Sequence, residues 1–361
     1  MQIVSKVIAA KPALQILDSV LFELKDSQLI LTASDGETTI RTTLGLDSAE
    51  GEGKVALQAK RLMETLKEFP EQPLTFDINN QNFGLNIYSA NGEYSFVGIN
   101  GEEYPEMIKQ LEDVNSFVID ANVLVDALNK TVFCTGDDEI RPVMNGVFFD
   151  LTPENITLVA TDAHRLVRYI NTSAHTEAPA NFILPKRPAN TLRSMVPKNA
   201  GDMTITFNSK NVRFDVGDSI LICRQIEGKF PNYNAVIPQN NNNKLIIDRQ
   251  SILNAARRVS VFANQGTGLI KLALTENKLT ISAQDIDFST SGEETLECNY
   301  SGMPMNIGFK APFLIELIAA IQSNEVVLEM SEPSRAGLIL PFENQENEEV
   351  VMLLMPMLLN D

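Results

Sequence analysis

The chain has 361 residues, with 29 Lys and Arg against 47 Asp and Glu, so its net charge at pH 7 is −18. Its 44% hydrophobic and 21% charged residues are typical of a folded protein and exclude wholesale disorder. No apolar run approaches the roughly 18 residues of a membrane helix, and the start lacks the long apolar core of a signal peptide. Three widely spaced cysteines argue against a disulfide framework or a cysteine-rich zinc site and favour a reducing cytoplasm.

Taken in chain order, the predicted elements form a series of sequence features that occurs three times. Residues 16–24 predict a strand, and a second strand ends in a turn at Asp35. A helical pattern opens at Lys60-Arg61, an alternating strand follows at 74–76, and Tyr104-Pro105 closes the series. Residues 143–151 resemble residues 16–24, and matching landmarks recur about 125 residues apart through the second and third copies. A repeat of this length is a domain and not a solenoid unit.

The repeats predict three similar domains of the α+β class. Each is expected to hold two helices packed on antiparallel strands, because helical and alternating periods are mixed within each copy. The expected domains are residues 1–115, 116–240 and 241–361, separated by the polar stretches 108–115 and 239–243. The first domain is expected to lack the opening strand and most of the first helix, since only about a dozen residues precede its match to the other copies.

Charge is segregated between the predicted elements. The helical segments sum to a positive charge, although the whole chain is strongly acidic, so the strands and loops carry the negative excess. One interpretation is a set of solvated helix faces. The other is a shared basic face that holds a phosphate backbone without reading bases. The cations of these segments expected to face DNA are Lys60, Arg61, Lys186, Arg187, Arg193 and Lys198.

Residues with catalytic chemistry are scarce. Asp162 and His164 could form a dyad, but the other copies have different residues at the histidine position, so a hydrolytic site is disfavoured. A turn at a strand end accounts better for the recurring Asp35, Asp162 and Asp285. We expect no metal and no cofactor, since no ligand spacing or phosphate loop is present. The apolar end of the chain, residues 350–359, predicts either a core edge strand or an adaptable methionine-rich groove, and the sequence leaves both open.

Five motifs in order, at residues 11–17, 141–146, 160–166, 228–233 and 355–357, resemble the bacterial sliding clamp, the beta subunit of DNA polymerase III. The resemblance covers nearly the whole chain. It implies a head-to-tail homodimeric ring of six domains that encircles double-stranded DNA without reading its sequence. It also implies a non-catalytic, cytoplasmic processivity factor that a clamp loader places on DNA and that tethers the alpha subunit of the replicative polymerase and other proteins with clamp-binding motifs. The alternative is a clamp-like protein-interaction module that no longer encircles DNA.

The resemblance also implies roles for individual residues. Lys11 would face DNA beside Lys186 and Arg187, and the dimer interface would include Tyr94, Val261 and Phe262. The family often has Gly where Ala163 stands. The groove for partner peptides would be formed by Met144, Thr161, His164, Arg165, Leu166, Pro231, Val236, Leu353, Leu354, Met355, Pro356 and Met357.

Overall fold

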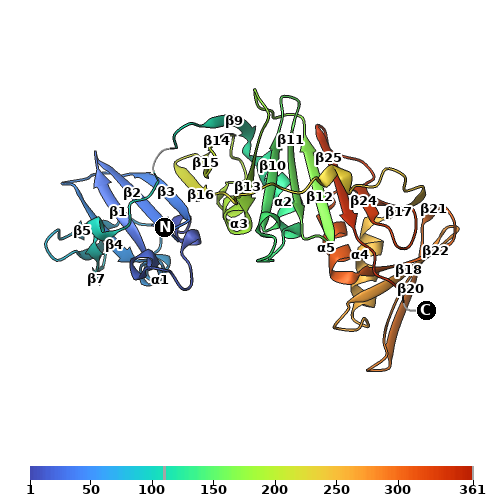
Figure 1. Cartoon of the computed structure of the whole chain (residues 1–361). Helices are drawn as coiled ribbons and strands as arrows, with labels where there is room; N and C mark the ends of the chain where they lie inside the picture. The colour runs from blue at the N-terminus through green and yellow to red at the C-terminus, as the bar shows by residue number, and fades with distance from the viewer. Residues whose placement is uncertain (109–110, 360–361) are drawn as a thin grey trace. The chain divides into compact units, whose positions relative to one another are not determined.

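The computed structural model describes residues 1–108 and 111–359, which form an α+β protein of antiparallel sheets and few helices (Figure 1). Lys109 and Gln110, within the first expected domain boundary, lie outside the described residues. The chain divides into two compact units, residues 1–123 with 187–225 and residues 124–186 with 226–361, called unit 1 and unit 2 below. The α-helices are α1 (Ala59–Lys67), α2 (Ala121–Thr131), α3 (Lys186–Met195), α4 (Arg249–Ser260) and α5 (Ala311–Ala320).

Unit 1 is built on a nine-stranded antiparallel sheet, sheet A, with the order β8-β4-β1-β2-β3-β16-β15-β14-β9. A smaller sheet has the order β5-β6-β7. The bounds in the first repeat are β1 (Ser19–Lys25), β2 (Gln28–Ser34), β3 (Thr38–Gly45), β4 (Gly53–Gln58), β5 (Thr75–Ile78), β6 (Gly84–Ser89), β7 (Gly92–Val97) and β8 (Ile99–Asn100). Those in the second are β9 (Asn115–Asp120), β14 (Asp202–Phe207), β15 (Asn211–Val216) and β16 (Ser219–Arg224).

Sheet A buries one face against short helices. Val20 and Phe22 of β1 are buried, and Leu62 of α1 is buried as α1 packs against β1 and β4. The described residues ahead of β1 hold the 3-10 helices η1 (Val4–Val7) and η2 (Gln15–Asp18), and η1 packs against β2 and β3. These described residues contain no strand and no α-helix.

Unit 2 also contains a nine-stranded antiparallel sheet, sheet C, with the order β13-β10-β11-β12-β25-β24-β23-β17-β21. Sheet D has the order β20-β19-β18-β22, and α4 packs on α5 and on β19 and β20. The strands of the second repeat are β10 (Gly146–Leu151), β11 (Ile156–Thr161), β12 (Arg165–Asn171) and β13 (Ala180–Pro185). Those of the third are β17 (Asn243–Asp248), β18 (Leu269–Thr275), β19 (Lys278–Asp285), β20 (Thr290–Glu297), β21 (Asn299–Ser301), β22 (Met305–Lys310), β23 (Glu325–Met330), β24 (Gly337–Pro341) and β25 (Glu348–Leu354).

The sheets continue from one repeat into the next. In sheet A, β3 of the first repeat pairs with β16 of the second, placing Arg41 opposite Ile220. In sheet C, β12 of the second repeat pairs with β25 of the third, placing Arg168 opposite Val351 (Figure 1). Because these ladders cross from repeat to repeat, the second repeat contributes strands to both compact units.

The three recurring aspartates form the turns that the sequence predicted. Asp35 Oδ1 accepts hydrogen bonds from the backbone N–H groups of Glu37 and Thr38. Asp162 Oδ1 accepts from the N–H groups two and three residues further on, and Asp285 Oδ1 does the same. Each carboxylate thus satisfies the backbone of a tight strand connection, which is the usual role of Asp in such turns.

The burial of the three cysteines leads to a labelling prediction. Cys134 and Cys223 are fully buried, and burial raises the pKa of both thiols, whereas Cys298 is only partly buried. Since the thiolate is the reactive form, iodoacetamide at about pH 8 should label Cys298 first in the native protein. Mass spectrometry of peptides would locate the label, with the urea-unfolded chain as the control. Equal labelling of Cys134 in the folded protein would contradict this burial.

Candidate functional site

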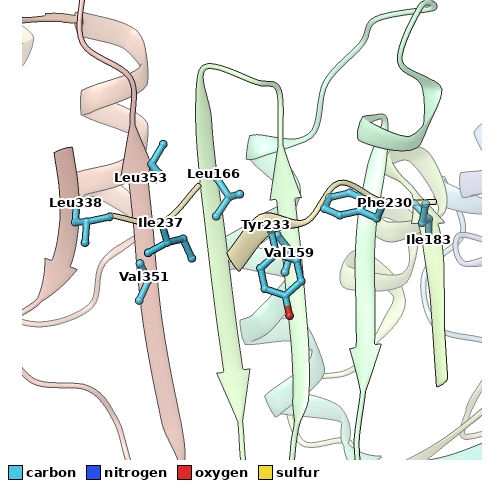
Figure 2. Close-up of a cluster of buried hydrophobic side chains, with 9 residues drawn as sticks. All are labelled: Val159, Leu166, Ile183, Phe230, Tyr233, Ile237, Leu338, Val351 and Leu353. Carbon is cyan, nitrogen blue, oxygen red and sulfur yellow. The ribbon is translucent and has the colours of Figure 1, made fainter. Parts of the chain in front are cut away.

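A segment of unit 2 crosses one face of sheet C and covers its strands. Residues 226–237, called the strap of unit 2 below, bury Phe230, Tyr233 and Ile237 against side chains of β11, β12, β13, β24 and β25 (Figure 2). Phe230 stacks on Phe148 of β10 with ring centroids 4.6 Å apart. The Tyr233 hydroxyl donates to Asp150 Oδ2 at 2.7 Å, so this polar group is satisfied although its ring is buried. The buried cluster is Val159, Leu166, Ile183, Phe230, Tyr233, Ile237, Leu338, Val351 and Leu353.

The connection between β11 and β12 presents His164 at the surface. Ala163 precedes it with a φ of 74°, in the left-handed region that favours glycine. Thr161 Oγ1 donates to the Arg165 carbonyl at 2.7 Å, and the Asp162 turn closes the loop. The His164 ring lies 6.3 Å from the Phe313 ring of α5, between centroids. The Asp162 carboxylate accepts hydrogen bonds from the His164 N–H and from Arg165 Nε, so its role in this loop is structural.

Arg165 joins β12 to α5 beneath this loop. Its side chain is buried, with Nε donating to Asp162 Oδ2 at 3.0 Å and Nη1 paired with the Glu316 carboxylate. Nη2 donates to the Phe133 carbonyl at 2.8 Å, and the guanidinium lies 4.3 Å from the centroid of the Phe313 ring. Buried charges persist when they are paired and hydrogen-bonded in this way. Arg165 therefore positions the loop and α5.

The apolar end of the chain begins as a strand inside sheet C, paired with β12 on one side and β24 on the other, so the expectation of an edge strand was wrong. β25 is a buried strand whose Leu353 lies opposite Leu166 of β12. Beyond β25, the Met355 N–H donates to the His164 carbonyl at 2.8 Å, and the Met357 N–H donates to the Gly308 carbonyl at 2.8 Å. Met355 is 42% exposed and Leu358 is 81% exposed. The chain therefore leaves the core at Met355 and presents apolar side chains at the surface.

All twelve residues of the expected groove lie in unit 2, but they differ in accessibility. Five are buried and can only form a floor: Thr161, Arg165, Leu166, Leu353 and Leu354. Four are exposed: His164, Pro231, Val236 and Met355. Three are partly buried: Met144, Pro356 and Met357.

Sequence reasoning missed residues that support this surface. Phe313 and Glu316 of α5 contact Arg165, and Tyr233 and Ile237 of the strap fill the sheet face. The apolar periodicity of α5 marked Phe313 as a helix-face residue, but it gave no sign of the arginine beneath it. The contacts come from elements about 150 residues apart in the chain, which local patterns do not report.

The expected DNA-facing cations have different environments. In unit 1, Lys11, Lys60, Arg61 and Lys198 are exposed and Arg193 is partly buried. Arg187 Nη1 pairs with Asp35 at 2.8 Å, and its Nη2 donates to the Val7 carbonyl at 2.7 Å. In unit 2, Lys186 Nζ pairs with Asp137 at 2.6 Å. Arg187 therefore has a structural role, and both paired cations have less charge available for a ligand than the exposed ones.

Apolar side chains are exposed near two sheet edges. Tyr94 lies on β7, an edge strand of its sheet, and Val97 on the same strand is also exposed. In unit 2, Val261 follows α4 and is 79% exposed, while Phe262 packs against Gly292 of the edge strand β20. The residues that the sequence did not single out here are Val97, Ile286 and Phe288. Exposed apolar side chains beside unpaired strand edges are typical of association surfaces.

Comparisons with known proteins agree with three repeats of one domain. The N-terminal, central and C-terminal domains of the DNA polymerase III beta subunit match residues 1–108, 118–232 and 234–358 in turn. The beta sliding clamp of Synechococcus elongatus is 28% identical over 352 residues, covering 94% of this chain and 92% of its own. That of Staphylococcus aureus is 27% identical over 361 residues, covering 97% and 94%.

Solved structures share the fold. The beta subunit of DNA polymerase III from Pseudomonas aeruginosa matches with a TM-score of 0.93 and 23% identity, and the sliding clamp of Bacillus subtilis with 0.91 and 22%. Both cover 99% of this chain and 96% of their own. The chain is thus a three-domain α+β clamp protein. It belongs to the family of bacterial beta sliding clamps, the beta subunits of DNA polymerase III.

Within the described residues, no helix is long and apolar enough to cross a membrane, and no group of three or more His, Cys, Asp or Glu residues is placed to hold a metal ion.

Proposed function

We propose that this protein acts in the cytoplasm as a homodimeric ring that encircles duplex DNA and tethers the replicative polymerase, with no catalytic activity of its own. Its mechanism is topological, because a closed ring cannot leave DNA sideways and a tether keeps the polymerase at high effective concentration near its template. The observation that carries the proposal is the three consecutive clamp domains, joined by sheets that continue from one repeat into the next.

The edge strands support head-to-tail closure. An edge strand offers unpaired N–H and C=O groups that a second chain can complete. We propose that β7 of one protomer, with Tyr94 and Val97, meets β20 of the next, with Val261 and Phe262 beside it. The exposed apolar side chains would then be buried in the interface. The same contact repeated twice closes a two-membered ring.

Exposed cations on α1 and in the segments beside η1 and α3 support loose contact with DNA. Lys11, Lys60, Arg61 and Lys198 are exposed, so they can contact phosphates through counterion release without reading bases. The acidic remainder of the chain repels DNA elsewhere on the surface. Such contacts are strong enough to guide the duplex and weak enough to allow sliding.

The surface around His164 and Met355 supports partner binding. Its buried residues include the apolar Leu166, Leu353 and Leu354, while Val236 and Met355 are exposed. We propose that it takes the extended hydrophobic tails of the polymerase alpha subunit, the clamp loader and other proteins with clamp-binding motifs. An extended apolar peptide is suited to a surface of flexible methionines, because these side chains adapt to several partners.

Retention on circular DNA tests the ring. After loading by the clamp loader, the protein should co-elute with nicked circular plasmid in gel filtration at moderate salt and be released when the plasmid is linearised. Val261→Asp should prevent closure, because it buries an unpaired charge in the proposed interface. Sedimentation of Val261→Asp should then show a monomer. The control is Ile140→Asp, which changes an apolar residue elsewhere in unit 2 that is 89% exposed, and this variant should remain dimeric.

The outcomes separate the proposed ring from its alternative. A wild-type chain that sediments only as a monomer at micromolar concentration and is never retained on circles would overturn encirclement. Partner peptides bound by such a monomer would instead establish the interaction module that no longer surrounds DNA.

A further inference from the structure

The repeats place a second strap on the other nine-stranded sheet. Residues 101–108, called the strap of unit 1 below, cross sheet A where the strap of unit 2 crosses sheet C, and Tyr104 occupies the position of Phe230. Tyr104 is buried with Leu17 and Ala56, and Met107 packs against them. The registers correspond as well, since Arg41 lies opposite Ile220 as Arg168 lies opposite Val351. Sheet A therefore carries a structural counterpart of the partner surface on sheet C.

The described residues of the two straps fill these surfaces to different extents. In unit 2, Tyr233 and Ile237 lie on the sheet within the buried cluster (Figure 2). In the strap of unit 1, Met107 occupies the sequence position that corresponds to Tyr233 in the strap of unit 2. A cavity of about 390 Å³ lies between the strap of unit 1 and the strands. Its floor is formed by Leu21, Thr32, Thr39, Arg41, Ile220 and Ile222. Three of these floor side chains are apolar and three are polar. A concave site that combines apolar side chains with a few polar groups is the usual form of a ligand site.

Arg41 is the feature that indicates a ligand. Its side chain is partly buried, and within the described residues its guanidinium has no hydrogen bond or ion pair. The counterpart Arg168 is paired with the Glu349 carboxylate and donates to Asn234 Oδ1. Arg41 has Ile220 directly opposite it on β16 and Thr32 directly opposite it on β2. A guanidinium in such a place has donors to spare for a carboxylate, which it can bind with two parallel hydrogen bonds.

The rest of the cavity has the opposite charge. Lys54 Nζ lies 3.7 Å from Glu23 Oε1 and 3.4 Å from Glu102 Oε1, so one cation serves two carboxylates. Glu106 of the strap adds a further exposed carboxylate to the lining. Among the residues that the structure describes, the cavity thus has an unpaired cation at the β3–β16 side and an excess of negative charge toward β1 and the strap. A ligand that complements both is anionic at one end and basic toward the other.

We propose that this cavity binds the C-terminal end of a partner peptide, with an apolar last residue on the floor and its α-carboxylate on Arg41. A basic residue upstream then faces Glu102 and Glu106. The floor from β1 to β16 spans three strand spacings of about 4.8 Å, roughly 14 Å, which suits about four extended residues. The assignment stands independently of ring closure, because every residue involved lies in unit 1.

A labelled peptide with a free or blocked C-terminus tests the assignment. The probe is fluorescein-Gly-Lys-Ser-Leu-Leu as the free acid, compared with its C-terminal amide by fluorescence polarisation at low salt. The acid should bind roughly tenfold more tightly than the amide, as expected for a charge-assisted bidentate contact. Arg41→Gln should abolish this preference, and Arg41→Lys should restore part of it. Thermal melts would establish that the variants are folded.

Matched variants separate this site from the partner surface of unit 2. Arg168→Gln, at the corresponding register position, and removal of residues 355–361 should both leave the preference for the acid unchanged. Equal affinity for acid and amide, an unaltered preference in Arg41→Gln, or absence of binding at millimolar peptide would overturn the proposal. Loss of the preference in Arg168→Gln alone would place the peptide on the other sheet and also overturn it.

Discussion

Replacing Lys130 with Met is expected to lower the free energy of unfolding by about 3–5 kcal/mol. Lys130 lies at the end of α2 and is only 3% exposed. Its Nζ is 2.6 Å from Asp126 Oδ2 and 2.6 Å from Glu348 Oε2 of β25, so it ties α2 to the strand that leads to the C-terminal segment. Without it, the buried Glu348 carboxylate has no cation. Urea unfolding followed by circular dichroism would measure the loss.

The loss should depend on pH in a defined direction. Burial raises the pKa of Glu348 above its ordinary value of 4.5, even beside Lys130. A carboxyl with a raised pKa in the folded state contributes stability below its unfolded pKa and loses it as pH rises through the folded pKa. Lys130→Met removes the attraction that favours the charged form, so its cost should be greater at about pH 8 than at about pH 5.

A paired variant provides the control. In Lys130→Met with Glu348→Gln, no uncompensated charge remains at position 348, and Asp126 still accepts from Gln322 Nε2 at 2.8 Å. The double variant should therefore be more stable than Lys130→Met alone. If Lys130→Met unfolded at the wild-type urea concentration, the ion pair would have no part in joining α2 to β25.

Removing residues 355–361 should weaken binding of a peptide from the polymerase tail by tenfold or more. The deletion takes away the exposed apolar side chains of Met355 and Leu358 and the backbone contacts to His164 and Gly308. β25 ends at Leu354 and keeps its pairing with β12 and β24, so the fold should survive. Loss of a few desolvated apolar contacts at the centre of an interface commonly has an effect of this size. Fluorescence polarisation with a labelled tail peptide would measure it.

The control is an exposed methionine elsewhere in unit 2. Met303→Ala removes a side chain that is 76% exposed and should leave the peptide affinity unchanged. His164→Ala should lower the affinity less than the deletion, because it removes one exposed ring but leaves the backbone contact in place. Unchanged affinity after the deletion would contradict the assignment of the partner surface.

The repeated landmarks predicted a large part of the fold. Local periodicity places strands and helix faces, and the aspartates at 35, 162 and 285 predicted their turns, because an Asp side chain satisfies backbone groups two and three residues away. Several expected groove residues were identified only through the resemblance, since Leu353 and Leu354 look like core residues by pattern alone. The structure shows that both side chains are buried, and their part in a groove stays a prediction.

The amino-acid sequence by itself determined the three copies of one domain, because their landmarks recur about 125 residues apart. It also determined the alternating strands and the Asp turns, because these depend on residues only two or three positions apart. Only the tertiary structure decided which repeats share a sheet and how the described parts of the two straps differ. It also decided that Arg168 is paired whereas Arg41 has no partner among the described residues. The same holds for Lys130 and Glu348, which lie 218 residues apart. Pairings between distant segments depend on how whole surfaces pack together, so local periodicity does not predict them.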